Sequence, residues 1–390
     1  MTVYLNDLGI MCALGDDRES VLRNFLDGSR AGLRNSEKYS TNRAYVVGEL
    51  DANLPALPAA LSELDCRNNR LALAVLMQIA DSVTALKKRV ARDRIAVVMG
   101  TSTSGIGASE IAFAHFHQHQ QWPKQFHYRQ QQLGSLAECV ARLLDVTGPT
   151  YTVSTACSSS ANALASARRL LALDVCDAVI VGGVDTLCQM TVQGFASLES
   201  LSDGYCNPFS ANRDGINIGE AGAIFVMSRE PGPVKLLGVG ASSDAHHISA
   251  PDPEGRGAIA AMTMALQQAR CDALEIDYVN LHGTATRQND AMESIAVNTI
   301  FGSEVACSSS KGMTGHTLGA AGALEAGLCW LLLAQNAECR LPPHVWDEAI
   351  DPQLKPLALT RPQQTAKRLQ ICLSNSFAFG GNNASVVLGK

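Results

Sequence analysis

The stretch that decides the fold is Val153-Ser-Thr-Ala-Cys-Ser-Ser-Ser-Ala-Asn-Ala-Leu-Ala-Ser-Ala-Arg-Arg-Leu-Leu171. An extended run passes through small polar residues into an apolar pattern of helical period, and Cys157 lies at the break. Unpaired N–H groups and the positive end of the macrodipole at the first turn of a helix favour a thiolate over a thiol. The stretch predicts a strand-to-helix elbow with a cysteine nucleophile. The alternative is that Cys157 is simply another buried cysteine among the 12.

A second elbow of the same kind occurs later in the chain. Residues 278–283 have the pattern of a strand that ends in a polar turn, and residues 308–316 lead into an Ala/Gly/Leu-rich helix. Glycine turns that feed strands also recur, at 217–228 and 379–388. This repetition indicates an α/β fold built from two similar halves, with the functional site between them.

The boundary between the halves is predicted at Glu230-Pro-Gly-Pro233, where two prolines and a glycine interrupt regular structure. Residues 1–230 then form the half that carries the nucleophilic cysteine, and residues 231–390 form the half that carries two histidines, His282 and His316. Each histidine alone would more often be a structural one. Both follow strand ends at comparable turns, so together with Cys157 they read as a Cys-His-His set.

Composition excludes several classes of protein. The 390 residues carry a net charge of −6, which argues against a nucleic-acid surface. The N-terminus has no basic and apolar leader pattern, and the longest apolar stretch, 318–334, contains Glu325 and is too short to span a membrane. The cysteines form no C-x-x-C pair, which favours reduced thiols. We therefore expect a cytoplasmic protein.

The local patterns predict further elements. Strands are expected at 3–10, 94–100 and 178–183, helices at 16–26, 71–86 and 133–144, and irregular structure at 28–60. The segment 112–132 is crowded with Gln and His, and we expect a mobile or interface-forming excursion there. His115, His117 and His119 raise the alternative of a metal site, but no carboxylate or cysteine in that stretch completes one, so no metal is predicted.

Several motifs in the same order resemble those of the β-ketoacyl-acyl-carrier-protein synthases, the decarboxylating condensing enzymes, nearly end to end. These motifs are Thr155-Ala-Cys-Ser-Ser, Asn207-Pro-Phe-Ser-Ala-Asn-Arg-Asp-Gly215, His282-Gly-Thr-Ala-Thr, Asn289-Asp-Ala-Met-Glu293, Ser310-Lys-Gly-Met-Thr-Gly-His316 and Ser374-Asn-Ser-Phe-Ala-Phe-Gly-Gly381. The resemblance implies a thiolase fold, a duplicated architecture of five layers, αβαβα.

The same resemblance implies the roles of the site residues. Cys157 would accept the acyl chain as a thioester. His282 and His316 would donate hydrogen bonds to the thioester oxygen of a malonyl extender while CO₂ leaves. The backbone N–H groups of Cys157 and Phe379 would hold the tetrahedral oxyanion, and Phe379 would also gate the acyl channel. No cofactor is expected apart from the phosphopantetheine arm of the carrier protein.

Supporting roles follow from the resemblance as well. Lys311, alone an ordinary surface lysine, would be a buried cation near His316, balanced by Asp290, Glu293 and Glu325. Thr284 and Thr286 would bind the amides of the phosphopantetheine arm. Ile106 would line the end of the acyl pocket, reached across a dimer interface.

The chain departs from the family pattern at several places. Ala378 replaces a glycine before the gate phenylalanine, so the gate is expected to swing less freely. Asn207 stands where many relatives have an arginine for carrier docking. The possible replacements are Lys124, Arg129, Arg67 and Arg70. The segment 112–132 differs most, which suggests a specialised substrate, and the chain looks similar to ketosynthases of polyketide or aryl-polyene pathways.

The sequence thus predicts a ketosynthase that extends an acyl chain by two carbons on an acyl carrier protein. It would act as a homodimer or as a heterodimer with a homologous chain-length factor, in fatty-acid or polyene/polyketide synthesis. One alternative is that the chain is itself the non-catalytic chain-length partner, which retention of Cys157, His282 and His316 opposes. Another is a non-decarboxylating thiolase, which needs a second cysteine near the site, and Cys372 comes too early in its strand.

Overall fold

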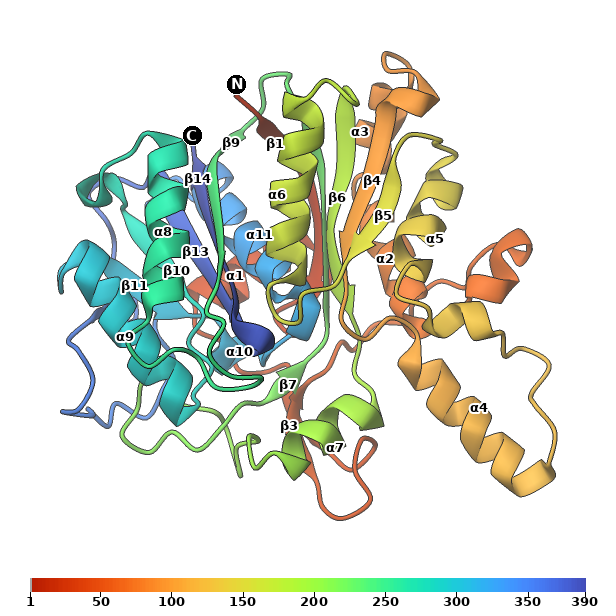
Figure 1. Ribbon diagram of the computed structural model, residues 1–390, viewed down its shortest axis with the longest axis horizontal. Helices are drawn as coiled ribbons and strands as arrows, with labels where there is room; N and C mark the ends of the chain where they lie inside the picture. The colour runs from red at the N-terminus through yellow and green to blue at the C-terminus, as the bar shows by residue number, and fades with distance from the viewer. Residues whose placement is uncertain (1) are drawn as a thin grey trace.

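A computed structural model describes residues 2–390 (Figure 1). Two sets of five strands dominate it. The first set comprises β1 (Tyr4–Cys12), β4 (Ile95–Gly100), β5 (Thr150–Val153), β6 (Ala178–Asp185) and β8 (Ala221–Ser228). The second set comprises β9 (Val234–Ser243), β10 (Tyr278–Leu281), β11 (Ala306–Ser309), β13 (Ile371–Ala378) and β14 (Asn382–Gly389). The short strand β12 (Ala358–Leu359) extends the second set at its edge.

The two sets have the same strand order. The first runs β1-β8-β6-β4-β5 and the second runs β9-β14-β13-β10-β11, so that each strand of one set has a counterpart at the same place in the other. A short antiparallel contact, in which Tyr4 faces Lys235 and Leu5 faces Val234, joins β1 to β9. This repeated order is the structural signature of the duplication that the two elbows predict.

Helices complete the layers. They are α1 (Arg18–Leu26), α2 (Arg67–Met77), α3 (Ala80–Lys87), α4 (Ile106–His119), α5 (Ser135–Leu144), α6 (Ser159–Ala172), α7 (Gln189–Ser197), α8 (Arg256–Ala269), α9 (Arg287–Phe301), α10 (Lys311–Thr314) and α11 (Ala321–Ala334). Figure 1 shows α8 and α9 outside the second set of strands, α2, α3 and α5 outside the first set, and α6 with α11 between the two sets. The predicted αβαβα fold is confirmed.

Three hydrophobic cores follow from this layering. Alternate residues of β4 face opposite sides: Val97 contributes to the outer core under α2 and α5, and Val98 to the middle core around α6 and α11. A separate outer core lies under α8 and α9. Helix α11 is apolar on every side because it lies in the middle layer, and residues 321–333 are all buried. Its one charged residue, Glu325, therefore needs a buried partner.

Some local predictions were wrong. The single helix expected at 71–86 is two helices, α2 and α3, because the backbone at Ile79 leaves the helical region (φ −113°, ψ 16°). The stretch expected to be irregular holds β2 (Leu33–Ser36) and β3 (Tyr45–Gly48), which pair with β7 (Ile218–Gly219) in a small second sheet.

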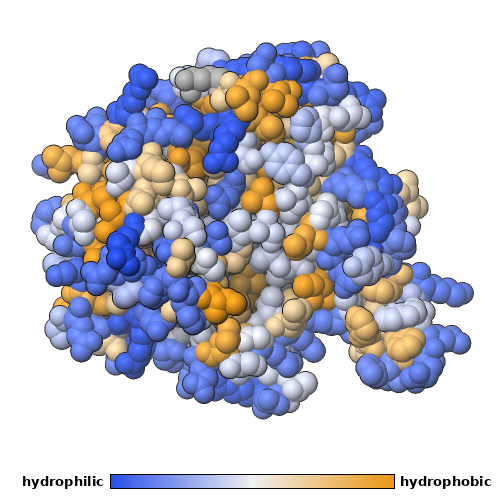
Figure 2. Space-filling model, in the orientation of Figure 1, coloured by the Kyte–Doolittle hydropathy of each residue, from blue (hydrophilic) through white to orange (hydrophobic). Residues whose placement is uncertain are grey.

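The segment 112–132 contains more regular structure than its composition suggests. Most of it belongs to an arm formed by α4 and the chain that follows, which extends from the body at the lower right of Figure 1. The ring of Trp122 packs against Phe113, Phe116 and Phe126, with centroid distances of 5.1, 4.6 and 5.3 Å. These aromatic contacts hold the returning chain on α4. Figure 2 shows apolar residues among polar ones on the surface of the arm.

Candidate active site

The first elbow presents Cys157 at the start of α6. Ala156, just before it, has a left-handed backbone (φ +50°), a strained conformation for a residue with a Cβ atom and one that persists where the surroundings enforce it. The hydroxyl of Ser159 accepts the backbone N–H of Thr155 at 2.9 Å and fixes the turn. Gly100 at the end of β4 lets α6 approach, since a Cβ there would lie 2.5 Å from the Ser160 backbone. The elbow thus holds Cys157 buried and only 6% exposed.

The second elbow brings His316 to the cysteine. Its Nε2 atom lies 3.1 Å from Sγ of Cys157, and its Nδ1 accepts the backbone N–H of Leu318 at 3.2 Å. Burial, with a contribution from the Lys311 charge, holds the pKa of His316 well below its ordinary value. The ring is therefore neutral at physiological pH, and its single proton is on Nε2, directed at the sulfur.

His282 completes the set. Its ring is nearly perpendicular to that of His316, with the centroids 5.4 Å apart, and burial lowers its pKa well below the ordinary value. The carboxylate of Glu293 accepts the backbone N–H groups of His282 and Gly283 at 2.7 and 2.6 Å. The structure therefore brings together Cys157, His282 and His316, which are far apart in the sequence.

The ionisation of Cys157 differs from the sequence expectation. Burial raises the pKa of its thiol to about 11, while the Lys311 charge and the backbone N–H groups of Phe379 and of Cys157 itself act in the opposite direction. Desolvation of the sulfur outweighs the helix N-terminus, so the resting group is a thiol.

Lys311 is buried, as the motif implies, and of the three carboxylates expected to balance its charge, Glu325 forms the direct ion pair, while the Lys311 charge also lowers the pKa of Glu293. Its ammonium group is paired with Glu325 of α11, and both side chains are 2% exposed. Glu293 instead braces the 282–283 turn. Asp290 accepts the backbone N–H groups of Phe209, Thr284 and Ala285 at 2.7, 3.0 and 3.2 Å. Two of the three carboxylates assigned to Lys311 thus shape the loop after β10. The spacing of charged residues in the sequence does not indicate these contacts with backbone N–H groups.

A cavity of about 200 Å³ leads to Cys157. Its walls include both histidines, Thr284, Thr286 and the aromatic residues Phe195, Phe377 and Phe379. The Phe379 and Phe195 rings lie 5.6 Å apart, and the turn after Phe379 uses left-handed backbone at Gly380 (φ +79°) and Gly381 (φ +72°). Ala378 has an ordinary extended backbone (φ −100°, ψ 155°) that needs no glycine. Ile106, at the start of α4, does not line this cavity within the residues described.

Comparison with known proteins agrees with this geometry. Residues 10–231 match the N-terminal domain of beta-ketoacyl synthases, and residues 234–344 match the C-terminal domain. The chain belongs to the beta-ketoacyl synthase family.

Relatives of this family member include ketosynthases. A 3-oxoacyl-acyl-carrier-protein synthase 2 from Rhizobium meliloti (strain 1021) is 38% identical over 263 residues, which are 62% of this chain and 61% of the relative. The ketosynthase ApeO from Xenorhabdus doucetiae, solved in complex with its chain length factor ApeC, is 48% identical with a TM-score of 0.94 and covers 100% of this chain and 98% of its own. The ishigamide ketosynthase/chain length factor is 25% identical with a TM-score of 0.88, over 100% and 99%.

Three of the four basic residues considered for carrier docking on this beta-ketoacyl synthase already form salt bridges. Arg67 bonds the buried Glu220, Arg70 bonds Asp65, and Arg129 bonds Glu63 and Glu138. Lys124 lines a small cavity on the arm. Asn207 accepts a long hydrogen bond from Arg30 at 3.4 Å. An ion-paired arginine can bind a new anion only by giving up part of its existing bonding, so these side chains are weaker candidates than their charge suggests.

Two further features bear on the chemistry of the beta-ketoacyl synthase. Among residues 2–390, no group of three His, Cys, Asp or Glu side chains is placed to hold a metal ion, and His115 and His119 stack on each other with centroids 4.5 Å apart. All 12 cysteines are free thiols, and Cys157 is the one that lines the active-site cavity in this part of the chain. No helix within these residues is long and apolar enough to cross a membrane.

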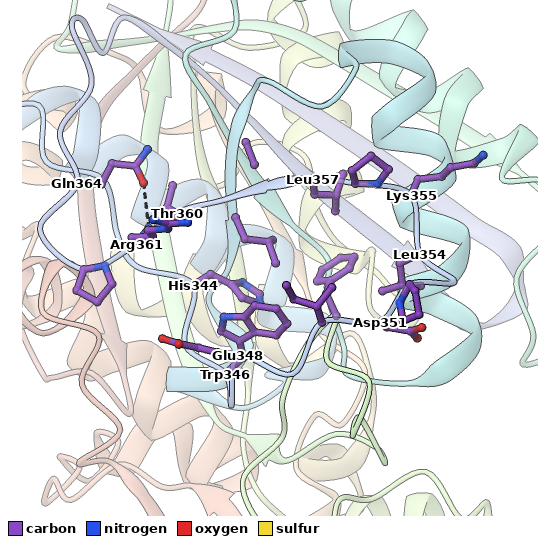
Figure 3. Close-up of a pocket in the computed structure, with 17 residues that line it drawn as sticks. His344, Trp346, Glu348, Asp351, Leu354, Lys355, Leu357, Thr360, Arg361 and Gln364 are labelled. Atoms are coloured by element: carbon purple, nitrogen blue, oxygen red, sulfur yellow. Dashed lines mark hydrogen bonds between the residues drawn. The ribbon is translucent and has the colours of Figure 1, made fainter.

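A larger cavity, of about 960 Å³, lies on another face of this synthase. Figure 3 shows it between residues 344 and 364, with His344, Trp346 and Leu357 on its walls. Both ring nitrogens of His344 are already bonded, to the backbone N–H of Ser309 and the carbonyl of Pro208. No cysteine lines this cavity within the residues described, so its size does not make it the site of catalysis.

Proposed function

We propose that this beta-ketoacyl synthase catalyses a decarboxylative Claisen condensation, in which an acyl group on Cys157 is joined to malonyl-acyl-carrier protein. The observation that carries the proposal is the contact of 3.1 Å between the Cys157 sulfur and a neutral His316, with His282 perpendicular beside it. A thiol next to two fixed N–H donors in a dry cavity suits acyl transfer and enolate stabilisation together.

In the first half-reaction Cys157 accepts the acyl group. The Cys157 thiol attacks the thioester carbonyl of the acyl carrier, the bond to the pantetheine sulfur breaks, and the departing carrier sulfur takes up the Cys157 proton as the new thioester forms. His316 cannot take that proton at Nδ1, which already accepts Leu318 N–H. Its Nε2–H donates to the sulfur and stabilises the thiolate, as does the N-terminus of α6.

In the second half-reaction the malonyl group loses CO₂. The electron pair of the breaking C–C bond passes into an enolate, and the enolate oxygen accepts hydrogen bonds from the N–H groups of His282 and His316. Each such donor contributes on the order of 3 kcal/mol to lowering the barrier. The enolate carbon then attacks the Cys157 thioester, the N–H groups of Cys157 and Phe379 hold the oxyanion, and collapse releases a β-ketoacyl-carrier protein with two added carbons and free Cys157.

Other residues have supporting roles in this proposal. Thr284 and Thr286 bind the pantetheine amides from the cavity wall, and Phe379 gates the acyl channel. Lys311, with Glu325, fixes the turn that carries His316, while Asp290 and Glu293 fix the turn that carries His282. Residues 1–230 act as the half that supplies the nucleophile and residues 231–390 as the half that supplies the histidines. Within the described residues the cavity is lined by no cysteine besides Cys157, so the second cysteine that a thiolase reaction needs is not found there.

A second subunit completes the enzyme in our proposal. Glu110 of α4 accepts the backbone N–H groups of Gln189 and Met190, which docks the arm on α7. Ile111 and Met190 of these helices are 70% and 63% exposed, and a second subunit would cover them in this proposal. The similarity to ApeO, which was solved with a chain length factor, favours a heterodimer of this kind, with Ile106 at the shared acyl pocket. We assign the protein to cytoplasmic polyene or polyketide synthesis.

The test is intact-mass spectrometry of the protein with a panel of acyl-carrier-protein thioesters, followed by malonyl-carrier protein. The wild type gains an acyl mass, then loses it as a β-ketoacyl product two carbons longer appears, and Cys157→Ala gains none. A protein that no donor acylates, alone or with a co-expressed homologous subunit, would instead be a non-catalytic partner.

A further inference from the structure

A buried carboxylate lies at the end of β6. Asp185 is the last residue of that strand and is fully buried. Because β6 and β4 pair in parallel, their carboxyl ends share one edge of the sheet, and Asp185 meets the turn that follows β4. Its carboxylate accepts the hydroxyls of Thr101, Ser102 and Thr103 at 2.5, 2.9 and 2.7 Å, and the backbone N–H groups of Ser102 and Thr103 at 3.0 and 2.9 Å. All of these groups donate to it, as suits an ionised carboxylate.

Ser102 connects this carboxylate to the second half of the chain. Its hydroxyl proton is donated to Asp185, so its oxygen accepts the backbone N–H of Gly319 at 3.2 Å. Gly319 itself packs on the carboxylate, because a Cβ atom there would lie 2.7 Å from Oδ2 of Asp185. These contacts join the turn after β4, in the first half, to the turn before α11, in the second.

The anchored turn is the one that orients His316. Leu318, just before Gly319, has a left-handed backbone (φ +54°), a conformation that is costly for a residue with a Cβ atom and needs support from its surroundings. From this conformation its N–H is donated to Nδ1 of His316 at 3.2 Å, and Nε2 then carries the ring proton toward Cys157. The bond from Gly319 to Ser102 supplies that support.

We infer that Asp185 is a positioning residue for His316, which it holds through Ser102 and Gly319, an inference that rests on the proposed function. Without the carboxylate, the Ser102 hydroxyl is free to rotate and its oxygen no longer has to face the Gly319 N–H. The turn then loosens, and His316 can place its proton on Nδ1, where it no longer reaches the sulfur. A residue of the half that supplies the nucleophile thus sets the donor direction of a histidine in the other half.

The charge of Asp185 also acts on the nucleophile. Burial is the main cause of the raised pKa of the Cys157 thiol, Lys311 acts against it, and the Asp185 charge adds to it. His282 and His316 add no charge, because burial depresses the pKa of each and leaves the rings neutral. The carboxylate therefore helps to keep the resting sulfur protonated, and a thiol resists alkylation and oxidation better than a thiolate does.

The first test removes the connection and leaves the charge. In Ser102→Ala the Gly319 N–H loses its acceptor, so part of the His316 population moves its proton to Nδ1, which nitrogen-15 NMR of the histidine-labelled protein reads. Condensation with malonyl-carrier protein slows roughly tenfold, the scale of one hydrogen bond. The matched control is Ser228→Ala, since this buried serine also donates to a side chain and accepts a backbone N–H. The control keeps the wild-type tautomer and rate. An unchanged tautomer in Ser102→Ala overturns the inference.

The second test removes the charge. In Asp185→Asn, iodoacetamide alkylates Cys157 roughly tenfold faster at about pH 8, because more of the sulfur is thiolate, while condensation slows. Peptide mass mapping follows each cysteine separately. Cys12, buried in the same middle core, keeps its wild-type rate, and Ser102→Ala, which retains the charge, shows no increase at Cys157.

Two outcomes of the alkylation experiment contradict the inference. One is a rate at Cys157 that does not rise in Asp185→Asn. The other is a rise shared by Cys12, which would mean that Asp185 only stabilises the fold. Alkylation and the histidine tautomer need neither carrier protein nor malonyl group, so both measurements report on Asp185 even where the protein catalyses no condensation, and the two proposals can fail independently.

Discussion

The backbone N–H of Leu318 is donated to Nδ1 of His316 at 3.2 Å, which leaves Nε2 to carry the ring proton toward the Cys157 sulfur. One backbone contact thus decides the direction in which the histidine can donate. In the proposed reaction His316 therefore acts as a hydrogen-bond donor and is unsuited to act as a base.

This arrangement predicts a histidine that does not titrate near neutral pH. Burial and Lys311 depress the pKa of His316, so the imidazole stays neutral, with its proton on Nε2, between about pH 6 and about pH 8. Nitrogen-15 NMR of the labelled protein reads both the tautomer and the titration. The urea-unfolded chain, whose histidines titrate near their ordinary value, is the control. A titration of His316 within that range would contradict the assignment.

Replacing each histidine separates the two half-reactions. His282→Ala lowers the rate of CO₂ release from malonyl-carrier protein by roughly 10²-fold, the scale of one lost oxyanion donor. It slows acylation of Cys157 much less, because the His282 side chain does not contact the Cys157 sulfur. His316→Ala slows both steps. Radiolabelled CO₂ and intact mass measure the steps separately, and His117→Ala, on the exposed side of α4, is the matched control. Equal losses in both steps for His282→Ala would argue against its assignment.

Glu293 gives the reaction a pH dependence. Burial raises the pKa of this carboxyl to about 7, although the N–H groups of His282 and Gly283 lower it. As the pH falls below about 7, Glu293 gains a proton and loses an acceptor for these groups, so decarboxylation slows. Glu293→Gln mimics the protonated form: its rate above pH 7 equals the low-pH rate of the wild type and no longer varies with this group. A Gln variant that keeps the wild-type profile would contradict the bracing role.

The buried pair Lys311–Glu325 predicts a strong coupling in stability. Lys311→Met leaves Glu325 unpaired in the middle layer and lowers the free energy of unfolding by about 3 kcal/mol, while Lys311→Met with Glu325→Leu recovers most of that loss. Urea unfolding of the four forms gives the coupling energy. The exposed pair Arg34–Asp51 serves as the control, because a surface pair contributes about 0–1 kcal/mol. Additive effects at 311 and 325 would rule the coupling out.

The periodic parts of the sequence predicted the fold well. The elbow at 153–171, the apolar strand 94–100 and the uniform apolar character of α11 each report a local environment that a single stretch of chain determines. The break at Ile79 and the small sheet of β2, β3 and β7 were missed, because a helix break without Gly or Pro and a short strand pair depend on distant packing.

The sequence predicted which residues form the site better than it predicted their hydrogen bonds and ionisation. Cys157, His282 and His316 come together as the motifs indicated. The bonding of Asp290 and Glu293 to backbone N–H groups, and the burial that makes Cys157 a resting thiol, depend on three-dimensional surroundings that residue spacing does not encode.

The matching strand order of the two halves has a consequence for the proposed reaction. Cys157 and His316 stand at equivalent elbows, before α6 and α11, in two sets of strands with the same order. In that reaction one elbow holds the acyl group and the other donates a hydrogen bond. Neither half carries both side chains, so both halves are needed to bring the two roles together.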